Sequence, residues 1–293
     1  MIHVGPAGWS YPDWDGIVYP RPKPRSFHPL PLIASLFTCV EINSSFYAMP
    51  SAKNAARWLE LVDGRDEFRF LAKLNRDFTH GPELGGKSFD VAVETFERGL
   101  APLHDAGKLS AVLLQFPVTF RRTPSSTARL ERLREAFPNH SLAIELRHAS
   151  WFEADSLSQL RNQTFSLLHI DLPAAKDHPP DLFTGTGPIG YLRLHGRNAD
   201  NWFRRGAGRD ERYDYSYGPS ELGPIAAKAR RLAQEHDEVY VVTNNHFEGQ
   251  AVANGLELRA QLEDRKVAAP PELVERYPRL KDVTVGFGQQ RLF

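Results

Sequence analysis

Acidic, basic and amide side chains stand near the carboxyl ends of several strand-like segments in this sequence. In residues 141–151 (SLAIELRHASW), aliphatic residues alternate with Ala143, Glu145 and Arg147. Side chains two residues apart on a strand share a face, so one face is aliphatic and the other becomes charged along its length. Such a carboxylate and guanidinium can supply a base, a metal ligand or an anion contact. They can also form a structural ion pair, and the sequence leaves both interpretations open.

The same gradient from apolar to polar recurs in other strand-like segments, for example TCVEIN at residues 38–43 and FRFLAKLN at residues 68–75. If the aliphatic faces pack under helices, the opposite faces point inward and their polar ends converge on one hollow. The side chains predicted in this hollow are Glu41, Asn43, Lys73, Gln115, Glu145, Arg147, His169, Asp171, Arg193, His195 and Asn244.

Eight strand-like segments alternate with helical patterns along the chain. The predicted strands are residues 2–8, 38–43, 68–75, 111–116, 141–147, 166–171, 189–196 and 238–244. This alternation predicts a (β/α)8 or TIM barrel, with one domain over residues 1–263, and such barrels build their sites at the carboxyl ends of the strands. Residues 172–188 are rich in Pro, Asp and Gly and predict an irregular connection after the sixth strand. Residues 264–293 are predicted to be a C-terminal extension that packs on the barrel or trails from it.

The composition excludes several classes of protein. The 293 residues include 36 Lys and Arg and 36 Asp and Glu, so net charge predicts no affinity for nucleic acids or membranes. One cysteine excludes an intramolecular disulfide. No basic and apolar leader and no apolar run of membrane-spanning length is present, which predicts a cytoplasmic protein.

The predicted hollow suits more than one chemistry. Glu41, Glu145, Asp171 and His195 are suitable ligands for a divalent metal, although no H-x-x-H or E-x-x-H spacing supports one. Glu41 and Glu145 could be the paired carboxylates of a carbohydrate-active hydrolase or isomerase. Nearby Lys73 or Arg147 would keep these carboxylates ionised, which disfavours a general acid.

The segment 197–218 is rich in arginine and aromatic residues. Arg204 and Arg205 follow Trp202, and three tyrosines come after them. Arginines interleaved with aromatic rings are typical of surfaces that contact phosphates and bases, so a non-catalytic nucleic-acid-binding module is an alternative. The arginines could instead pair with the acidic residues of the same segment, which are Asp200, Asp210, Glu211 and Asp214.

Seven segments together resemble the YecE-like family, a group of bacterial and archaeal TIM-barrel proteins that carries a domain-of-unknown-function label. The segments are GWSYPDW (8–14), VEINSSFYAMPS (40–51), FRFLAKLNRDFTH (68–80), VLLQFP (112–117), AIELRHASW (143–151), YLRLHGR (191–197) and VVTNNHFEGQAVANG (241–255). The resemblance implies a fold and a set of polar positions but no reaction. The positions that match its polar motifs are Glu41, Asn43, Tyr47, Lys73, His80, Gln115, Glu145, Arg147, His195, Arg197 and Asn244.

We therefore expect an enzyme or ligand-binding barrel that acts on a phosphorylated or nucleic-acid-like anion at its carboxyl face. If it is an enzyme, it is a hydrolase of phosphodiester or glycosidic bonds, with a divalent metal left open. The predicted catalytic residues are Glu41 and Glu145, as base or metal ligand, and His195, as proton donor or ligand. The predicted substrate-binding residues are Asn43, Tyr47, Lys73, His80, Gln115, Arg147, Arg197 and Asn244. The predicted partner is a small anionic substrate or a nucleic acid, and not a membrane.

Overall fold

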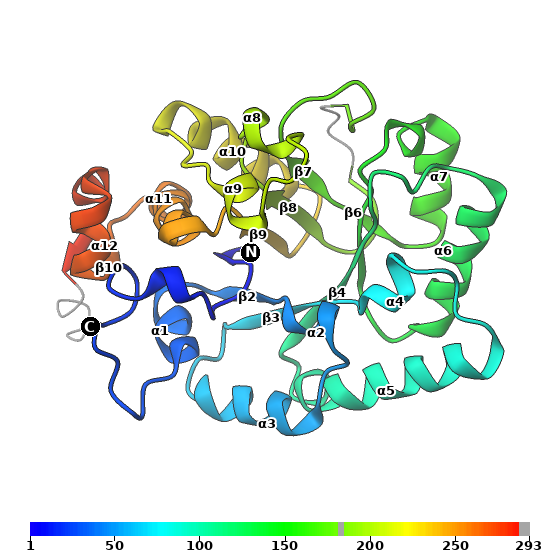
Figure 1. Cartoon of the computed structure of the whole chain (residues 1–293), viewed down its shortest axis with the longest axis horizontal. Helices are drawn as coiled ribbons and strands as arrows, with labels where there is room; N and C mark the ends of the chain where they lie inside the picture. Colours follow the sequence, from blue (N-terminus) through cyan, green and yellow to red (C-terminus); the bar gives the residue numbers. More distant parts are fainter. Residues whose placement is uncertain (181–184, 287–293) are drawn as a thin grey trace.

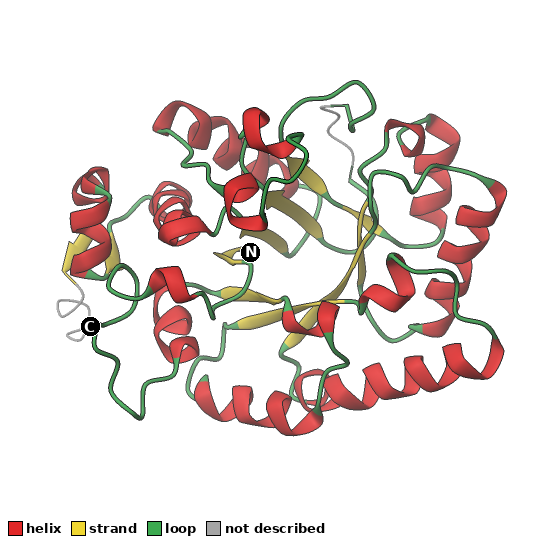
Figure 2. Ribbon diagram, viewed as in Figure 1, coloured by secondary structure: helices red, strands yellow, loops and turns green. Residues whose placement is uncertain are grey.

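The computed structural model describes residues 1–180 and 185–286. Parallel strands form the centre of the molecule and helices surround them (Figures 1 and 2). The central strands are β1 (Ile2–Pro6), β2 (Cys39–Ile42), β3 (Arg69–Lys73), β4 (Leu109–Gln115), β5 (Leu142–Glu145), β6 (Ser166–Leu167), β7 (His169–Asp171), β8 (Gly190–Leu194) and β9 (Val239–Thr243).

The strands follow the circular order of a TIM barrel. One sheet has the order β2-β3-β4-β5-β6 and the other β1-β9-β8-β7, with every pair parallel. β6 and β7 are two halves of one predicted strand, separated at Leu168, and each half pairs with a different neighbour. β1 and β2 meet at a single bridge between Ala7 and Glu41. The hydrogen-bond ladder is therefore not continuous around the barrel, but the predicted fold class is confirmed.

In the described residues, seven long helices cover the outside of the barrel, one after each strand except the sixth. They are α1 (Pro29–Leu36), α3 (Ala52–Leu61), α5 (Gly86–Asp105), α6 (Pro124–Ala136), α7 (Ala154–Asn162), α10 (Pro219–Leu232) and α11 (Gln250–Glu263). Side-chain caps start three of them: His28 Nδ1 accepts from Leu30 N, Ser51 Oγ from Asn54 N, and Thr123 Oγ1 from Ser126 N. Residues 172–180 and 185–188 contain no helix or strand, as predicted, and residues 181–184 of this connection lie outside the described part.

Four short helices lie where the strands end: α2 (Ser44–Tyr47), α4 (Arg76–Thr79), α8 (Ala199–Trp202) and α9 (Arg209–Tyr213). In Figure 1 they face the viewer, so this view looks onto the carboxyl face of the barrel. The last two lie within the segment of residues 197–218 that is rich in arginine and aromatic residues. They form because Asn198 Oδ1 accepts from Asn201 N and the Glu211 carboxylate accepts from Gly208 N, which satisfies free amides at each helix start.

The core has two parts, as the alternating strand faces predicted. The larger cluster lies between strands and helices and includes Val40, Phe70 and Ile144. The smaller cluster fills the barrel interior and contains Ala7, Cys39, Leu71, Ala111, Leu113, Ala143, Leu168, Ile189, Tyr191, Tyr240 and Val242. Glu41, Lys73 and Glu145 come two residues after Cys39, Leu71 and Ala143 on the same strands, so they share the interior face at its carboxyl end.

The described part of the C-terminal extension packs on the barrel. It contains β10 (Val267–Ala269), α12 (Pro271–Arg276), the 3-10 turn Pro278–Asp282 and β11 (Thr284–Gly286), with β10 and β11 paired. The extension covers the outer side of α11, which is why Val252, Leu256 and Leu258 are all buried on a helix that has neighbours on most sides. In the part of the chain that the structure describes, no helix is long and apolar enough to cross a membrane.

Because the extension shares a core with the barrel, damage to it should destabilise the whole domain. Leu273 is fully buried, and we expect Leu273→Ala to lower the free energy of unfolding by about 2 kcal/mol. Chemical denaturation followed by fluorescence measures this, and the transition should stay single. The exposed Val91 supplies the control, since Val91→Ala should change stability by less than about 0.5 kcal/mol. An unchanged stability in Leu273→Ala would show that the extension is an independent appendage.

Candidate functional site

Two buried glutamates from one sheet meet one arginine from the other sheet at the carboxyl end of the barrel interior. Arg193 on β8 donates from Nε and Nη2 to the two carboxylate oxygens of Glu41 on β2, at 3.0 and 2.6 Å. Its Nη1 donates to Glu145 Oε2 on β5 and to Gln115 Oε1 on β4, both at 2.9 Å. Tyr191 Oη adds a further bond to Glu41, at 2.8 Å. One guanidinium thus neutralises and joins carboxylates that lie 104 positions apart in the sequence.

The second oxygen of Glu145 is also engaged. Arg147 donates from Nε to Glu145 Oε1 at 2.6 Å, and His195 Nε2 lies 3.3 Å from the same oxygen. Asn244 Nδ2 lies 3.0 Å from His195 Nδ1 and donates to it, which leaves the ring proton on Nε2, facing Glu145. Burial lowers the pKa of His195 to about 4, partly opposed by Glu145, so this imidazole is neutral near pH 7.

These contacts limit what the predicted catalytic residues can do. Glu41, Glu145 and His195 are fully buried and brought together as predicted. Burial alone would raise the pKa of Glu145, but its cationic neighbours, Arg147 first, outweigh burial and hold the pKa well below its usual range. Glu145 is therefore a permanent anion in a network that arranges the mouth of the barrel, and the catalytic roles of all three residues stay predictions.

Lys73 at the end of β3 is the one predicted cation of the interior whose charge has no anionic partner in the described residues. Its side chain is 7% exposed, and its Nζ lies 4.2 Å from the centre of the Phe46 ring. Among residues 1–180 and 185–286, no hydrogen bond or ion pair engages this Nζ. Burial and then the charge of Arg193 lower the pKa of Lys73 to about 7, against the attraction of Glu41 and Glu145.

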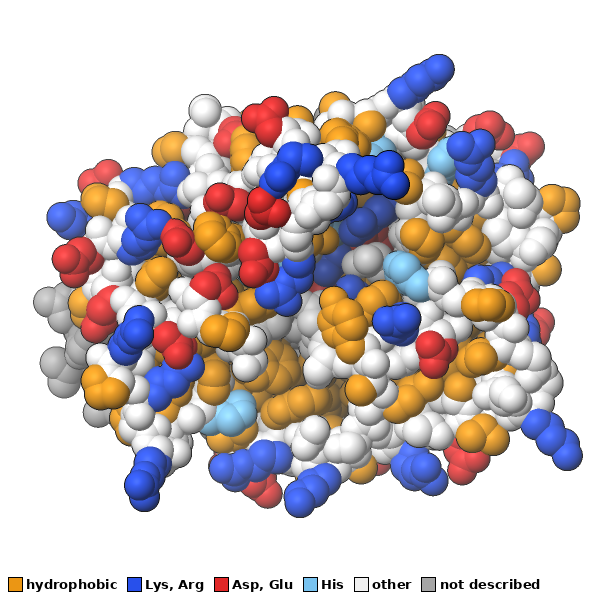
Figure 3. All heavy atoms as spheres, viewed as in Figure 1, with side chains coloured by type: hydrophobic (Ala, Val, Ile, Leu, Met, Phe, Trp, Pro, Cys, Tyr) orange, Lys and Arg blue, Asp and Glu red, His pale blue; other side chains and the backbone are white. Residues whose placement is uncertain are grey.

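The rim above this lysine is aromatic and basic. Phe46 and Tyr47 on α2 meet edge to face, and His80 after α4 packs edge-on against Phe46. The Arg147 side chain is 16% exposed, and its Cζ lies 6.0 Å from the centre of the Trp202 ring on α8. Figure 3 shows Lys and Arg side chains gathered in a hollow near the middle of this face, beside a histidine. Burial and then Lys73 lower the pKa of His80 to about 4, so it adds no charge near pH 7.

The predicted amide residues take different places. Gln115 and Asn244 hold Arg193 and His195, so they support the buried network. Asn43 precedes α2 and is half-buried beside Tyr11. Tyr47 is 66% exposed on the rim, where a bound molecule can reach it.

Strand six corrects the sequence prediction. Leu168 and Ile170 pack with the interior cluster, so His169 and Asp171 face outward and not into the mouth. The prediction assumed that the outer face of each strand is aliphatic because a helix covers it. No described helix follows this strand, so its outer face accepts polar side chains. The predicted ligand Arg197 lies there too: it is 41% exposed and pairs with Asp171 at 2.6 Å and Glu221 at 3.1 Å.

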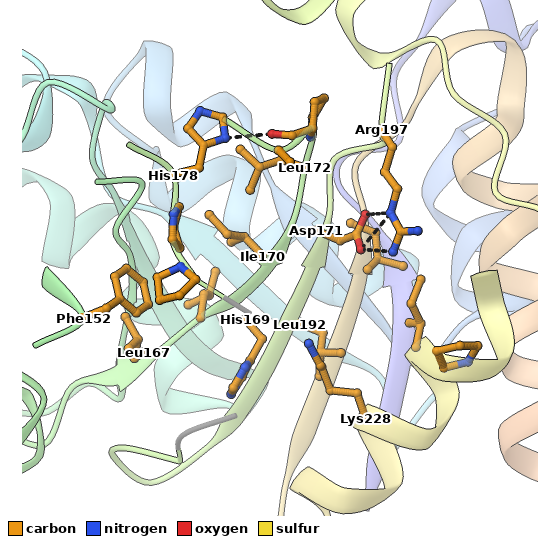
Figure 4. Close-up of a pocket in the computed structure, with 18 residues that line it drawn as sticks. Phe152, Leu167, His169, Ile170, Asp171, Leu172, His178, Leu192, Arg197 and Lys228 are labelled. Atoms are coloured by element: carbon orange, nitrogen blue, oxygen red, sulfur yellow. Dashed lines mark hydrogen bonds and ion pairs between the residues drawn. The ribbon is translucent and has the colours of Figure 1, made fainter. Parts of the chain in front are cut away.

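A cavity of about 390 Å³ fills the place where the sixth helix of a barrel would pack (Figure 4). Phe152, Leu167 and Ile225 line it together with prolines of the irregular connection. Figure 4 shows Ile170 and Asp171 on opposite sides of β7, with Arg197 over Asp171. This cavity lies outside the barrel and away from Lys73 and Arg147, so it is separate from the mouth.

Two arginines of residues 197–218 pair with acidic residues of the same segment, and a third donates to backbone carbonyls within it. Arg204 pairs with Glu211, and Arg209 pairs with Asp210 at 2.8 Å. Arg212 donates to the Trp202 carbonyl at 3.0 Å. These contacts match the interpretation in which the arginines pair with acidic residues of their own segment.

The residues present do not fit a divalent metal. Within residues 1–180 and 185–286, no group of three or more His, Cys, Asp or Glu side chains is arranged to hold one. A cation between Glu41 and Glu145 would have to displace Arg193, and Asp171 lies on the other face of its strand.

Comparison with known proteins shows which family this barrel belongs to. Residues 3–277 match the family described as protein of unknown function DUF72. The chain belongs to this family. The UPF0759 protein YunF of Bacillus subtilis strain 168 is 31% identical over 274 residues, which cover 88% of this chain and 93% of that protein. The UPF0759 protein YecE of Escherichia coli K12 is 30% identical over 165 residues, or 56% of this chain and 54% of that one.

A solved DUF72 family protein from Enterococcus faecalis V583 superposes with a TM-score of 0.79 at 30% identity, covering 90% of this chain and 96% of that one. The resemblance to the YecE-like family is thereby confirmed.

Sequence reasoning missed the roles of two residues at the mouth of this DUF72 protein. Arg193 was predicted in the hollow, but not as the counterion whose donors are taken by Glu41, Glu145 and Gln115. The signal was the presence of two interior glutamates, which need a buried counterion. Phe46, the ring under the Lys73 amine, was not among the predicted site residues. Its place three residues after Asn43, at the start of a turn above the barrel, was the available signal.

Proposed function

We propose that the mouth of this barrel binds a small anion, such as a phosphorylated or carboxylated compound, and that the protein is an enzyme or ligand-binding barrel acting on it. The observation that carries the proposal is the Lys73 amine, which is buried at the mouth with no anionic partner among the described residues. A buried charge costs several kcal/mol unless it is paired, and a bound anion would supply the missing partner.

The balance of charge around Lys73 supports an anionic ligand. The mouth contains three cations and two carboxylates, which are Lys73, Arg147, Arg193, Glu41 and Glu145. Arg193 pairs with both carboxylates. Arg147 is the partly exposed member. Its Nε and Nη2 both lie 2.6 Å from Glu145 Oε1, while no hydrogen bond or ion pair in the described residues engages its Nη1, so that group can turn to a ligand. A planar guanidinium beside an ammonium suits carboxylate and phosphate groups.

A carbohydrate-active enzyme with paired carboxylates has less support. Such an enzyme needs one protonated carboxyl group and one carboxylate, placed on either side of a glycosidic bond. Here a single guanidinium lies between Glu41 and Glu145, and the pKa of Glu145 is held well below its usual range. The carboxylate oxygens of Glu41 and Glu145 all contact neighbouring side chains, so none of them is available to a sugar.

A nucleic-acid-binding module also has less support, because Arg204 and Arg209 are paired with acidic neighbours. A salt titration separates the two ideas. A module that neutralises phosphates along residues 197–218 would lose affinity steeply as salt rises, and Arg204→Ala with Arg205→Ala would abolish binding. Small-anion binding at the mouth would survive that double substitution.

Sulfate is a suitable probe because its charge does not change between about pH 6 and pH 9. We expect sulfate to bind the wild-type protein at about pH 6, and its dissociation constant to rise roughly tenfold by about pH 9 as Lys73 loses its proton. Isothermal titration calorimetry or a thermal shift series measures this. His80 and His195, each with a pKa near 4, do not titrate in this range.

Two variants make the test specific. Lys73→Met should weaken sulfate binding at about pH 6 and remove the pH dependence. Arg57→Met is the matched control, because Arg57 lies in an exposed pair with Glu60. A sulfate affinity that is the same in Lys73→Met and in the wild type would contradict the proposed site.

A further inference from the structure

The backbone around Lys73 is fixed by contacts that have no need of its amine. Ser45 Oγ donates to the Lys73 carbonyl at 2.6 Å and to the Ile42 carbonyl at 3.0 Å. Asn75 Nδ2 donates to the Ser45 carbonyl at 3.0 Å. These bonds tie α2 to the end of β3, so the start of the lysine side chain is held at one point of the barrel wall. The amine at its other end projects to the mouth beside the Phe46 ring.

The neighbours of this amine disfavour its charged form. The guanidinium groups of Arg147 and Arg193 are close enough to repel an ammonium, against the attraction of the Phe46 ring. The nearest carboxylates, Glu41 and Glu145, are already bound by those guanidinium groups. A pKa lowered to about 7 leaves about half of the amine unprotonated at neutral pH. Desolvation and a cationic neighbour are the two conditions that turn a lysine into a nucleophile.

We propose that Lys73 is a nucleophile that forms an imine with a small carbonyl compound carrying a carboxylate or phosphate group. This inference rests on the proposed function, because Arg147 would hold the anionic group of the same compound. The fixed backbone and the buried amine, which lies over the Phe46 ring without an anionic partner in the described residues, are the geometry that supports it.

The step is balanced without any further reactant. The lone pair of Lys73 Nζ attacks the carbonyl carbon, the C=O π pair moves to oxygen, and a proton passes from nitrogen to that oxygen to give a carbinolamine. The hydroxyl then takes a proton from solvent and leaves as water while the nitrogen lone pair forms the C=N bond. The resulting iminium ion can withdraw electrons from the bond next to it, which is the chemistry of aldol cleavage, decarboxylation and dehydration of carbonyl compounds.

Reductive trapping tests the proposal on the intact protein. Glyoxylate, a small aldehyde with a carboxylate, is added at about pH 7 with cyanoborohydride, which delivers hydride to an imine carbon and leaves a stable secondary amine. Peptide mass mapping then gives the labelling rate of each lysine. We expect Lys73 to be modified at least roughly tenfold faster than the exposed Lys53, Lys87 and Lys281.

Glycolaldehyde, an uncharged aldehyde of similar size, separates this inference from the proposed function. Faster labelling of Lys73 by glyoxylate than by glycolaldehyde, with the difference lost in Arg147→Gln, supports both. Fast but equal labelling by the two aldehydes keeps Lys73 as the nucleophile and overturns the anion site. Labelling of Lys73 no faster than that of the surface lysines overturns the imine, even if sulfate binds as expected. Lys73→Met, whose melting temperature checks its folding, identifies the peptide.

Discussion

Arg193→Met is expected to lower the free energy of unfolding by about 4 kcal/mol, or the melting temperature by roughly 10 °C. The arginine is fully buried and holds Glu41 and Glu145 on its two sides, at 2.6 and 2.9 Å. Methionine fills a similar volume but leaves two carboxylates with too few donors in the barrel interior. Removing one partner of a buried ion pair costs more than the pair contributes, because the remaining charge keeps its desolvation cost.

Urea denaturation followed by tryptophan fluorescence measures the change. Arg57→Met supplies the control, since Arg57 and Glu60 form an exposed pair that should contribute less than about 1 kcal/mol. Adding Glu41→Gln to Arg193→Met should recover part of the loss, because it removes one of the stranded charges. Equal stabilities of Arg193→Met and the Arg57 control would contradict a structural role for this network.

Lys73→Met is expected to have the opposite effect and to stabilise the protein by about 3 kcal/mol near pH 7. The shift of the Lys73 pKa from 10.5 to about 7 corresponds to a burial cost of about 4 kcal/mol at neutral pH. Methionine avoids this cost and loses only the contact with Phe46, which is worth about 1 kcal/mol. A residue that is kept at such a cost to stability is typical of a functional site.

The pH dependence gives this prediction a sign that can be checked. Between about pH 7 and pH 10 the unfolded chain still holds the lysine proton and the folded chain has released it, so wild-type stability rises with pH. The advantage of Lys73→Met should therefore shrink across this range. Thermal unfolding of both proteins at several pH values measures it, with the exposed Lys53→Met as a control that shows no such trend. A destabilised Lys73→Met would mean that Lys73 has a counterion and would remove the basis of the proposed site.

The two expected effects describe one arrangement in which paired charges hold the barrel mouth and one unpaired amine remains for a ligand. Arg193 and Lys73 lie on interior faces of β8 and β3 and are both cations with long flexible stems. They differ in that carboxylates from β2 and β5 reach Arg193 and leave Lys73 without a hydrogen bond in the described residues. Stability and binding are therefore assigned to different cations of the same hollow.

The sequence determined the barrel and the faces of most of its strands. Cys39 and Glu41 alternate with Val40 and Ile42, and Leu71 and Lys73 alternate with Phe70 and Ala72. Because strand side chains alternate with a period of two, this pattern placed the polar ends of β2, β3, β5 and β8 in one interior without any knowledge of pairing. The resemblance to the YecE-like family added the matching polar positions. The match of residues 3–277 to the DUF72 family confirms the resemblance.

Only the tertiary structure decided which charges cancel. Sequence spacing cannot show that Arg193 reaches Glu41 across the barrel, or that Arg204 closes on Glu211 in its own segment. It also misplaced Asp171, because the face rule assumes a covering helix and no described helix covers the sixth strand. Local periodicity sets which face of a strand points inward, and the sequence contains that periodicity. Which charge remains unpaired depends on distances between distant segments, and these exist only once the chain has folded.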